Sequence, residues 1–461
     1  MMPCATWSQP SAAWCSIPTD PLRSCILAGG LVVVWLSSLR QHPTYLDAIG
    51  PNMKYVIVIP DGAADTPIDD LGGKTPLQVA RKPHMDSVAM NGKLGTVRTT
   101  PPGYSAGSDV CTLCLLGYDP AKYHPGRAPL EAAAMGLKLD AQDWVFRCNL
   151  VTIVDGIMMD HSAGHIGDKE ARLLLEEVRK HLAPDAGTTP LTFYPGVSYR
   201  NLMTFRGGDF TGLKTTPPHD IPEQPIKGYM PKGKGGDLLS TLIEKSHEVL
   251  KGHDINLTRR DLGENEASHI WLWGQGRAAN VPTFESRFKK NGAMITAVDL
   301  LRGIANLLGW KNLDCPGITS YHDTDYVAQG RVTCESIEKY DIVCCHVEAP
   351  DEASHAANYT EKVESIEAID KHIVGPVLEK LKSLGEAAGG WRLLIMPDHA
   401  TQCTTRKHYD EPVPFAIAGT GVPKRPQVQL PYTEEAARQG DLHIGNGYDL
   451  MEYFLYGHMA K

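Results

Sequence analysis

The sequence lacks features that would place the protein in several common functional classes. It has no block of Lys and Arg residues, and its formal net charge is −9, whereas a nucleic-acid backbone is bound through a basic face. The apolar run at residues 25–36 is far shorter than the roughly 20 residues that a transmembrane helix needs. The Gly- and Lys-rich stretch 233–236 lacks the spaced Gly-Lys-Ser/Thr of a P-loop. We therefore expect no nucleic-acid partner, no membrane partner and no nucleotide-cradling loop.

The 11 cysteines do not follow a pattern typical of a disulfide framework. Cys344 and Cys345 are adjacent within an apolar run, and Cys111 and Cys114 lie in a helix-like stretch. The last two have the spacing of half a zinc knuckle, but no second Cys or His pair follows at a suitable distance. We expect these cysteines to be free and buried, as in a protein of the reducing cytoplasm.

Residues 1–52 need separate treatment, because the apolar run 25–36 resembles the core of a signal peptide. Arg23 would supply only a thin positive region, Asp20 lies beside it, and no clear small-residue cleavage site follows. Met53 directly precedes the first convincing strand. The interpretation that we favour is a disordered N-terminal extension and not an export signal.

From residue 53 onward, predicted strands alternate with predicted helices. Residues 55–59 form a continuous apolar run rich in Val and Ile, and residues 341–348 and 392–396 are similar, as expected of strands buried on both faces. Between the last two, residues 361–382 place apolar side chains at helical spacing. This alternation predicts an α/β fold, in which a mostly parallel sheet has helices on both faces.

The middle of the chain has a different pattern. Residues 145–153 alternate apolar with polar side chains and predict a half-exposed strand, and further helices and short strands follow up to about residue 250. We therefore expect an inserted α+β domain that splits the core. The expected division is an extension at 1–52, a first core part at 53–149, the insertion at 150–290 and a second core part at 291–461.

Acidic and imidazole side chains follow each predicted core strand, and the carboxyl ends of parallel strands meet at one edge of a sheet. Each motif alone has an ordinary explanation, as a turn or as a helix N-cap. Together they offer ligands for two divalent cations about 4 Å apart, as two-metal phosphoryl transfer requires. The candidate ligands are Asp61, Asp351, His355, Asp398, His399 and His408.

Ser108 is the candidate nucleophile. The apolar run 110–116 predicts a helix with Ser108 at its N-terminus, where backbone N–H groups and the helix dipole favour a phosphoryl anion. The ordinary alternative, that Ser108 only caps the helix, does not exclude this role. Ligation to a cation would supply the activation that a serine hydroxyl lacks at neutral pH.

Five motifs carry a resemblance to a known family. They are Ile59-Pro60-Asp61-Gly62, Ala106-Gly107-Ser108-Asp109, residues 348–355 (EAPDEASH), Pro397-Asp398-His399 and residues 408–414 (HYDEPVP). Together they resemble the archaeal-type cofactor-independent (2,3-bisphosphoglycerate-independent) phosphoglycerate mutases of the alkaline phosphatase superfamily. The resemblance runs from about residue 54 to the end of the chain. It implies an alkaline-phosphatase-like core, with the insertion acting as a lid.

The resemblance also implies the roles of single residues. One metal would be held by Asp351, His355 and His408, and a second by Asp61, Asp398, His399 and the Ser108 oxygen. Ser108 would carry the phosphoryl group between 3-phosphoglycerate and 2-phosphoglycerate, without added 2,3-bisphosphoglycerate. Mn²⁺ is the expected metal, and Mg²⁺ and Zn²⁺ also fit such ligands. The candidates for binding the small phosphorylated hydroxy-acid substrate are Arg127, Arg147, His161, His165 and Arg200.

Two departures from the family pattern keep the substrate open. His161 and His165 stand where similar mutases have an arginine-rich lid segment, and Trp273 stands near the place of an arginine before Gly-x-Gly. An imidazole or an indole does not grip an anion as a guanidinium does. These variants look like a bacterial branch with a proposed homoserine kinase role. The alternatives are therefore phosphotransfer to homoserine or a similar acceptor, simple phosphate hydrolysis, and a catalytically inactive metal-binding protein.

Overall fold

The computed structural model of the chain describes residues 52–183, 190–278, 280–385, 389–423 and 429–458. All of them belong to one compact unit, residues 43–461. The expected N-terminal extension lies outside the described residues, apart from its last position. No helix among the described residues is long and apolar enough to span a membrane.

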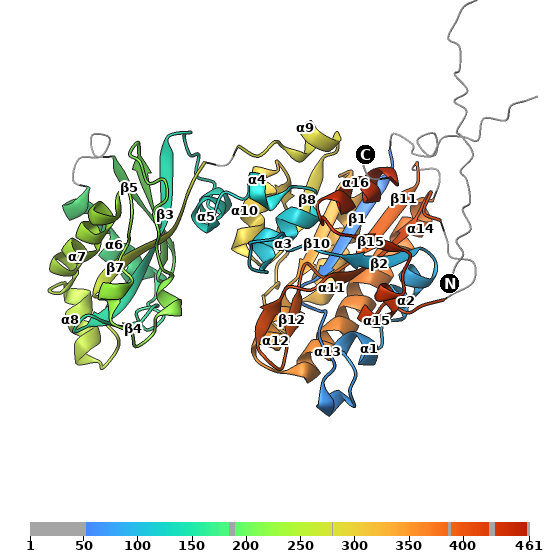
Figure 1. Cartoon of the computed structure of the whole chain (residues 1–461), viewed down its shortest axis with the longest axis horizontal. Coiled ribbons are helices and arrows are strands. Elements are labelled where there is room, and N and C mark those ends of the chain that lie inside the picture. The colour runs from blue at the N-terminus through green and yellow to red at the C-terminus, as the bar shows by residue number, and fades with distance from the viewer. Residues whose placement is uncertain (1–51, 184–189, 279, 386–388, 424–428, 459–461) are drawn as a thin grey trace, which may run out of the picture. The chain divides into compact units, whose positions relative to one another are not determined.

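An eight-stranded sheet forms the core, with β1 near its middle (Figure 1). Strands β11, β1, β10, β8 and β9 run parallel, β15 is parallel to β2, and β14 is antiparallel to its neighbours β11 and β2. The predicted α/β class with a mostly parallel sheet is confirmed. In spatial order the strands are β15 (Leu442–Ile444), β2 (Lys93–Val97), β14 (Val413–Gly419), β11 (Trp391–Ile395), β1 (Lys54–Pro60), β10 (Ile342–Val347), β8 (Gly292–Ile295) and β9 (Lys311–Asn312).

Successive side chains of β1 point to opposite faces of the sheet, and they are apolar on both. Helices therefore cover both faces. Ile57 and Ile59 belong to one apolar cluster, which α3, α10 and α16 complete, and Val56 and Val58 belong to another, which α2, α13 and α14 complete. The core helices are α1 (Pro76–Val79), α2 (Pro83–Met90), α3 (Ser108–Leu115), α4 (Pro120–Tyr123), α5 (Arg127–Ala134), α9 (Phe284–Phe288), α10 (Asp299–Leu307), α11 (Tyr326–Ile337), α12 (Ala349–His355), α13 (Tyr359–Ile369), α14 (Gly375–Leu384), α15 (Glu434–Arg438) and α16 (Asp449–Tyr456).

The long helix predicted over residues 361–382 is present, but it is not a regular α-helix throughout. A π-helical turn, Asp370–Val374, joins α13 to α14 without a break. Short 3₁₀ turns lie at Asp69–Leu71, Pro218–Asp220 and Ile226–Gly228.

The segment of the chain that separates the two core parts in sequence forms a second, five-stranded sheet (Figure 1). Its strand β3 pairs antiparallel with β4, β6 and β7, and β5 pairs with β6. Helices α6 and α7 pack on this sheet. The elements are β3 (Asp143–Val154), β4 (Ile157–Asp160), α6 (Asp168–Leu182), β5 (Leu191–Val197), β6 (Arg200–Arg206), α7 (Gly236–Leu250), α8 (Asp254–Asp261) and β7 (His269–Arg277). The domain boundaries given above stay a prediction.

The prediction that residues 145–153 form a half-exposed strand is wrong. In β3 these residues are buried, apart from a half-buried Arg147. Phe146 and Leu150 pack into the core under α6 and α7, while Val145 packs on the other side against Ala128 and Ala132 of α5. A helix from outside the sheet therefore covers the face that the alternating pattern assigned to solvent.

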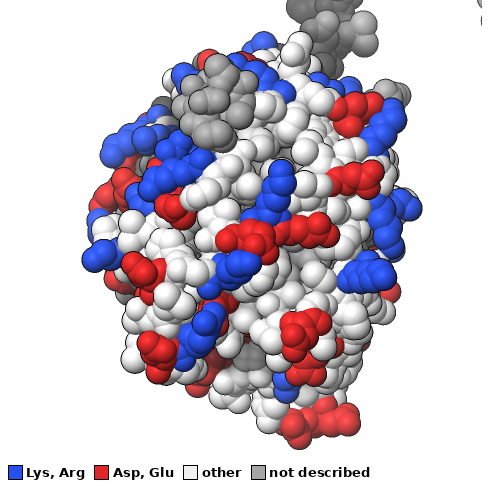
Figure 2. All heavy atoms as spheres, turned by 90° about the vertical axis from the view of Figure 1, so that its left-hand side faces the viewer, with Lys and Arg blue, Asp and Glu red and all other residues white. Residues whose placement is uncertain are grey.

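The outer face of the second sheet's helices carries charges of both signs. Figure 2 shows Lys and Arg side chains interspersed with Asp and Glu, among wide uncharged areas. The eight cysteines within the described ranges are free, and all but Cys334 are buried, as the sequence predicted.

Candidate active site

The ends of two neighbouring core strands, β1 and β11, bring the first group of candidate ligands together. Strand β1 is paired with β10 on one side and with β11 on the other, so the residues that follow these strands share one edge of the sheet. Asp61, Asp398 and His399 are fully or almost fully buried there. His399 Nε2 lies 3.4 Å from Asp61 Oδ1 and 3.6 Å from Asp398 Oδ2. These atoms can converge on a single cation.

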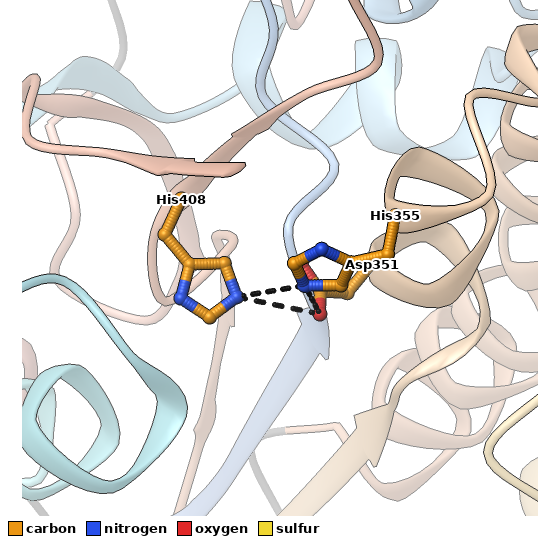
Figure 3. A group of neighbouring side chains, drawn as sticks. All are labelled: Asp351, His355 and His408. Atoms are coloured by element: carbon orange, nitrogen blue, oxygen red, sulfur yellow. Dashed lines mark hydrogen bonds and ion pairs between the residues drawn. The ribbon is translucent and has the colours of Figure 1, made fainter. Parts of the chain in front are cut away.

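A second group consists of Asp351 and His355 on α12 and His408 on a short hairpin. The hairpin strands are β12 (Ala400–Gln402) and β13 (Lys407–Tyr409). Figure 3 shows the two imidazoles pointing toward each other, with the Asp351 carboxylate beside them. The two Nε2 atoms are 3.0 Å apart. Asp351 Oδ2 lies 3.1 Å from Nε2 of His355 and 3.6 Å from Nε2 of His408.

The hydrogen bonds of this second group suit a cation. His355 Nδ1 lies 3.0 Å from the Arg406 carbonyl oxygen, and His408 Nδ1 lies 3.0 Å from that of Ala106. A carbonyl can only accept, so each Nδ1 carries a proton, and both Nε2 atoms turn their lone pairs to the same point. Two lone pairs at this separation repel unless a cation or a proton lies between them. In the metal-free chain the hydrogen bond to Asp351 raises the pKa of His355 to about 9, so that a proton is held there.

The first group also has an unfilled acceptor. Asp61 Oδ1 is buried and has no hydrogen-bond partner, although a buried carboxylate oxygen is costly without one. Burial and the nearby Asp398 carboxylate raise the pKa of the Asp61 carboxyl well above its usual value. A bound cation would give Asp61 Oδ1 a partner and would offset the negative charge of the two buried carboxylates. The rings of His399 and His408, with centroids 4.1 Å apart, make the two groups neighbours.

Ser108 lies beside the first group. Its Oγ donates to Asp61 Oδ2 at 3.2 Å and lies 3.3 Å from His399 Nε2. Ser108 is the first residue of α3, and the extended Gly107 is the N-cap, so the capping role considered above belongs to the glycine. The hydroxyl therefore belongs to the first turn of the helix, whose N–H groups are not used within the helix.

Three of the predicted substrate-binding residues line one cavity of about 690 Å³. They are Arg127, Arg147 and Arg200, and Glu131 and Glu348 line it with them. Arg147 pairs with Glu131 at 2.9 Å. Arg127 Nε lies 3.4 Å from the carboxylate of Asp109, the residue after the candidate nucleophile. The cavity therefore combines positive charge with a wall that reaches the metal-ligand groups.

The other two predicted substrate-binding residues, His161 and His165, do not line this cavity. Their rings lie 5.8 and 6.1 Å from the ring of Tyr199. His161 is also 6.1 Å from His219, which is 5.3 Å from Trp273. The Trp273 ring in turn lies under the Arg147 guanidinium, at 4.0 Å. A row of rings thus connects His161 with the arginine cavity.

Sequence reasoning missed two residues of the site, His346 and Glu348. His346 Nε2 lies 2.9 Å from Asp61 Oδ2, and its Nδ1 lies 3.1 Å from the Thr296 hydroxyl. Burial lowers the pKa of His346 to about 4, so the ring is neutral. Glu348 Oε2 is buried without a partner, 4.0 Å from the same ring nitrogen. A histidine inside a wholly apolar run was the available signal, because such a residue needs a buried partner.

Comparisons with known proteins agree with this geometry. A sequence profile of the family described as 2,3-bisphosphoglycerate-independent phosphoglycerate mutase matches residues 89–256. A protein of that name from Methanothrix thermoacetophila is 43% identical over 405 residues, which cover 88% of this chain and 100% of the relative. A probable one from Geobacter sulfurreducens is 42% identical over 87% of this chain and all of its own length. A solved structure from Pyrococcus horikoshii superposes with a TM-score of 0.72 at 28% identity, covering 89% of this chain and 98% of the other.

Proposed function

Because the chain belongs to the family of 2,3-bisphosphoglycerate-independent phosphoglycerate mutases, we propose that it interconverts 3-phosphoglycerate and 2-phosphoglycerate through a phosphoserine at Ser108. One observation carries the proposed role of Ser108. Its hydroxyl, at a helix N-terminus, lies within 3.3 Å of two side chains of a buried metal-ligand group. A surface serine would have neither the anion-binding N–H groups nor the means of activation.

The proposed reaction consists of two transfers that balance each other. In the first, Ser108 Oγ attacks the phosphorus of 3-phosphoglycerate, the bond from phosphorus to the O3 oxygen breaks, and O3 takes up a proton. The proton of Ser108 leaves toward Asp61 Oδ2, which already accepts its hydrogen bond. In the second, the 2-hydroxyl of the bound glycerate attacks the phosphoserine, loses its proton and becomes 2-phosphoglycerate, and Ser108 recovers its proton. No phosphoryl donor besides the substrate is consumed.

Two divalent cations are part of the proposal. Asp351, His355 and His408 would hold one, and Asp61, Asp398, His399 and the Ser108 oxygen would hold the other. The oxygen and nitrogen donors, the orphaned Asp61 oxygen and the facing imidazoles all fit such ions. When bound, the cations supply positive charge for the Ser108 oxygen and the transferring phosphoryl group. Mn²⁺ is our first choice, with Mg²⁺ or Zn²⁺ as substitutes.

The three arginines of the cavity would bind the anionic groups of the substrate. Phosphoglycerate has a carboxylate and a phosphate, both of which match the guanidinium fork of Arg127, Arg147 or Arg200. We also propose that residues 150–290 act as a lid, with His161 and His165 facing the bound substrate on closure. Exclusion of water would protect the phosphoserine from hydrolysis. The free, buried cysteines support a place in the reducing cytoplasm.

The proposed function is tested with pure protein, Mn²⁺ and 3-phosphoglycerate, without ATP and without 2,3-bisphosphoglycerate. A mutase forms 2-phosphoglycerate, which enolase converts to an ultraviolet-absorbing product. Release of free phosphate instead would identify a hydrolase, and product formation only with ATP and homoserine would identify a kinase. None of the relatives described above carries a kinase name.

Ser108→Ala is the matching variant, and we expect it to form no phosphoenzyme from ³²P-labelled substrate and no 2-phosphoglycerate. Its Mn²⁺ content should stay close to that of the wild type, because six of the seven ligands remain. Turnover in this variant would refute the assignment of the nucleophile.

A further inference from the structure

Thr401 lies between the two metal-ligand groups. It is the middle residue of β12, fully buried, two positions after His399 and directly opposite His408 in the hairpin register. Its Oγ1 lies 2.5 Å from Asp351 Oδ1 and 3.1 Å from His399 Nδ1. One hydroxyl thus contacts a ligand from each group, and the steps described above make no use of it.

The chemistry of the partners fixes the direction of both hydrogen bonds. The Asp351 carboxylate can only accept, so the Thr401 hydroxyl donates its proton to Oδ1. The hydroxyl oxygen then accepts the N–H of His399 Nδ1. With the proton on Nδ1, the lone pair of His399 lies on Nε2, the atom that faces Ser108 and Asp61. This is the tautomer that a metal ligand needs, and a hydrogen bond at the other ring nitrogen is the usual way to select it.

Hydrogen bonds hold the Thr401 backbone in place on both sides. Its N–H donates to the Ala64 carbonyl at 3.1 Å, and its carbonyl accepts from the buried Lys362 ammonium at 2.7 Å. Gly62 leaves room for the contact, because a Cβ there would lie 2.7 Å from Thr401 Oγ1 and 2.5 Å from Asp351 Oδ1. The loop after β1 and helix α13 therefore hold the Thr401 backbone, and Gly62 of the same loop leaves room for its hydroxyl.

We propose that Thr401 is a positioning residue shared by both metal-ligand groups: its hydroxyl selects the Nδ1–H tautomer of His399 and orients the Asp351 carboxylate. This inference rests on the proposed two-metal function. It predicts that removal of one hydroxyl weakens cation binding at both groups, although Thr401 itself touches neither cation.

The experiment compares Thr401→Val, which keeps the shape and removes the hydroxyl, with Thr401→Ser, which keeps the hydroxyl. Each full-length chain is stripped of metal and titrated with Mn²⁺ in a calorimeter. We expect Thr401→Val to bind Mn²⁺ about 10- to 100-fold more weakly at both metal-ligand groups. The Mn²⁺ affinities of Thr401→Ser should stay within about threefold of those of the wild type. Rescue by serine separates the hydrogen-bonding role from the packing of the methyl group.

Thr333→Val is the matched control, because Thr333 is also fully buried and its hydroxyl donates to a backbone carbonyl, that of Gln329, and to no candidate metal ligand. Its Mn²⁺ binding should equal that of the wild type. If circular dichroism shows that Thr401→Val does not fold, Thr401→Ala replaces it. Wild-type Mn²⁺ affinities in the folded valine or alanine variant, or an equal loss of affinity in the serine variant, would overturn the proposed role of Thr401. These outcomes would leave the proposed function of the protein in place. A wild-type chain that binds no Mn²⁺ would overturn the proposed function as well.

Discussion

Replacing Gly62 by alanine tests whether the loop after β1 is built around the Asp351 carboxylate. Gly62 has a φ of +60°, where an L-residue other than glycine loses roughly 1–2 kcal/mol. The added Cβ would also lie 2.5 Å from Asp351 Oδ1 and 3.0 Å from the Asp351 Cα. Since one of these atoms belongs to the backbone, α12 must move and take the carboxylate with it.

The expected cost combines both effects. Overpacking of a dense site costs about 1–3 kcal/mol, so Gly62→Ala should lower the free energy of unfolding of the metal-free chain by about 2–5 kcal/mol. Displacement of Asp351 should weaken Mn²⁺ binding by about 10- to 100-fold. Urea unfolding followed by tryptophan fluorescence measures the first quantity, and calorimetric titration measures the second.

Gly72→Ala provides the control for this substitution. Gly72 has a similar φ of +68°, but a Cβ there would meet no atom within 4 Å. It should lose only the conformational part, about 1–2 kcal/mol, and bind Mn²⁺ like the wild type. Equal destabilisation of the two variants, together with unchanged Mn²⁺ binding by Gly62→Ala, would refute the argument.

Four further predictions follow from three individual contacts. Because the pKa of His355 in the metal-free chain is raised to about 9, Mn²⁺ must displace a proton there, and Mn²⁺ affinity measured by calorimetry should rise with pH up to about 9. The same raised pKa stabilises the metal-free chain fully below about pH 6.5, and this contribution should be lost between about pH 6.5 and 9 in urea unfolding curves. Lys362→Met removes the cationic partner of the buried Asp65 carboxylate, which lies 2.9 Å from the ammonium, and should cost about 3–5 kcal/mol of unfolding free energy; a loss below 1 kcal/mol would contradict this. Arg147→Lys keeps the charge but loses the stacking on Trp273, so KM for 3-phosphoglycerate should rise about tenfold with little change in kcat, and an unchanged KM in steady-state kinetics would argue against substrate contact.

The core strands could be predicted from sequence because their burial is visible in local composition. Tyr55–Ile59, residues 341–348 and residues 392–396 are mostly apolar, and each matches an observed strand to within two residues. The polar residues that follow them could be placed at one edge, since parallel strands share their carboxyl ends. The structure does bring Asp61, Asp398 and His399 together, as that reasoning expected.

Other parts of the site depend on pairing that a single sequence does not show. His346 lies within a predicted strand, but its contact with Asp61 follows from the register of β10 against β1. The Thr401 hydroxyl gains its contact with Asp351 from a helix fifty residues away. The burial of β3 likewise depends on α5, whose packing the alternating pattern of β3 does not reveal.

The two metal-ligand groups differ in their access to solvent. The side chains of Asp61 and Asp398 are fully buried and that of His399 is almost so, whereas His355 and His408 keep 37% and 27% of their side-chain surface exposed. If the two proposed ions are bound, we expect their exchange to follow an order: a chelator or a competing metal would reach the ion at His355 first, and the inner ion would depart only afterwards. A preparation short of metal would accordingly be a population of half-loaded molecules that retain the inner ion.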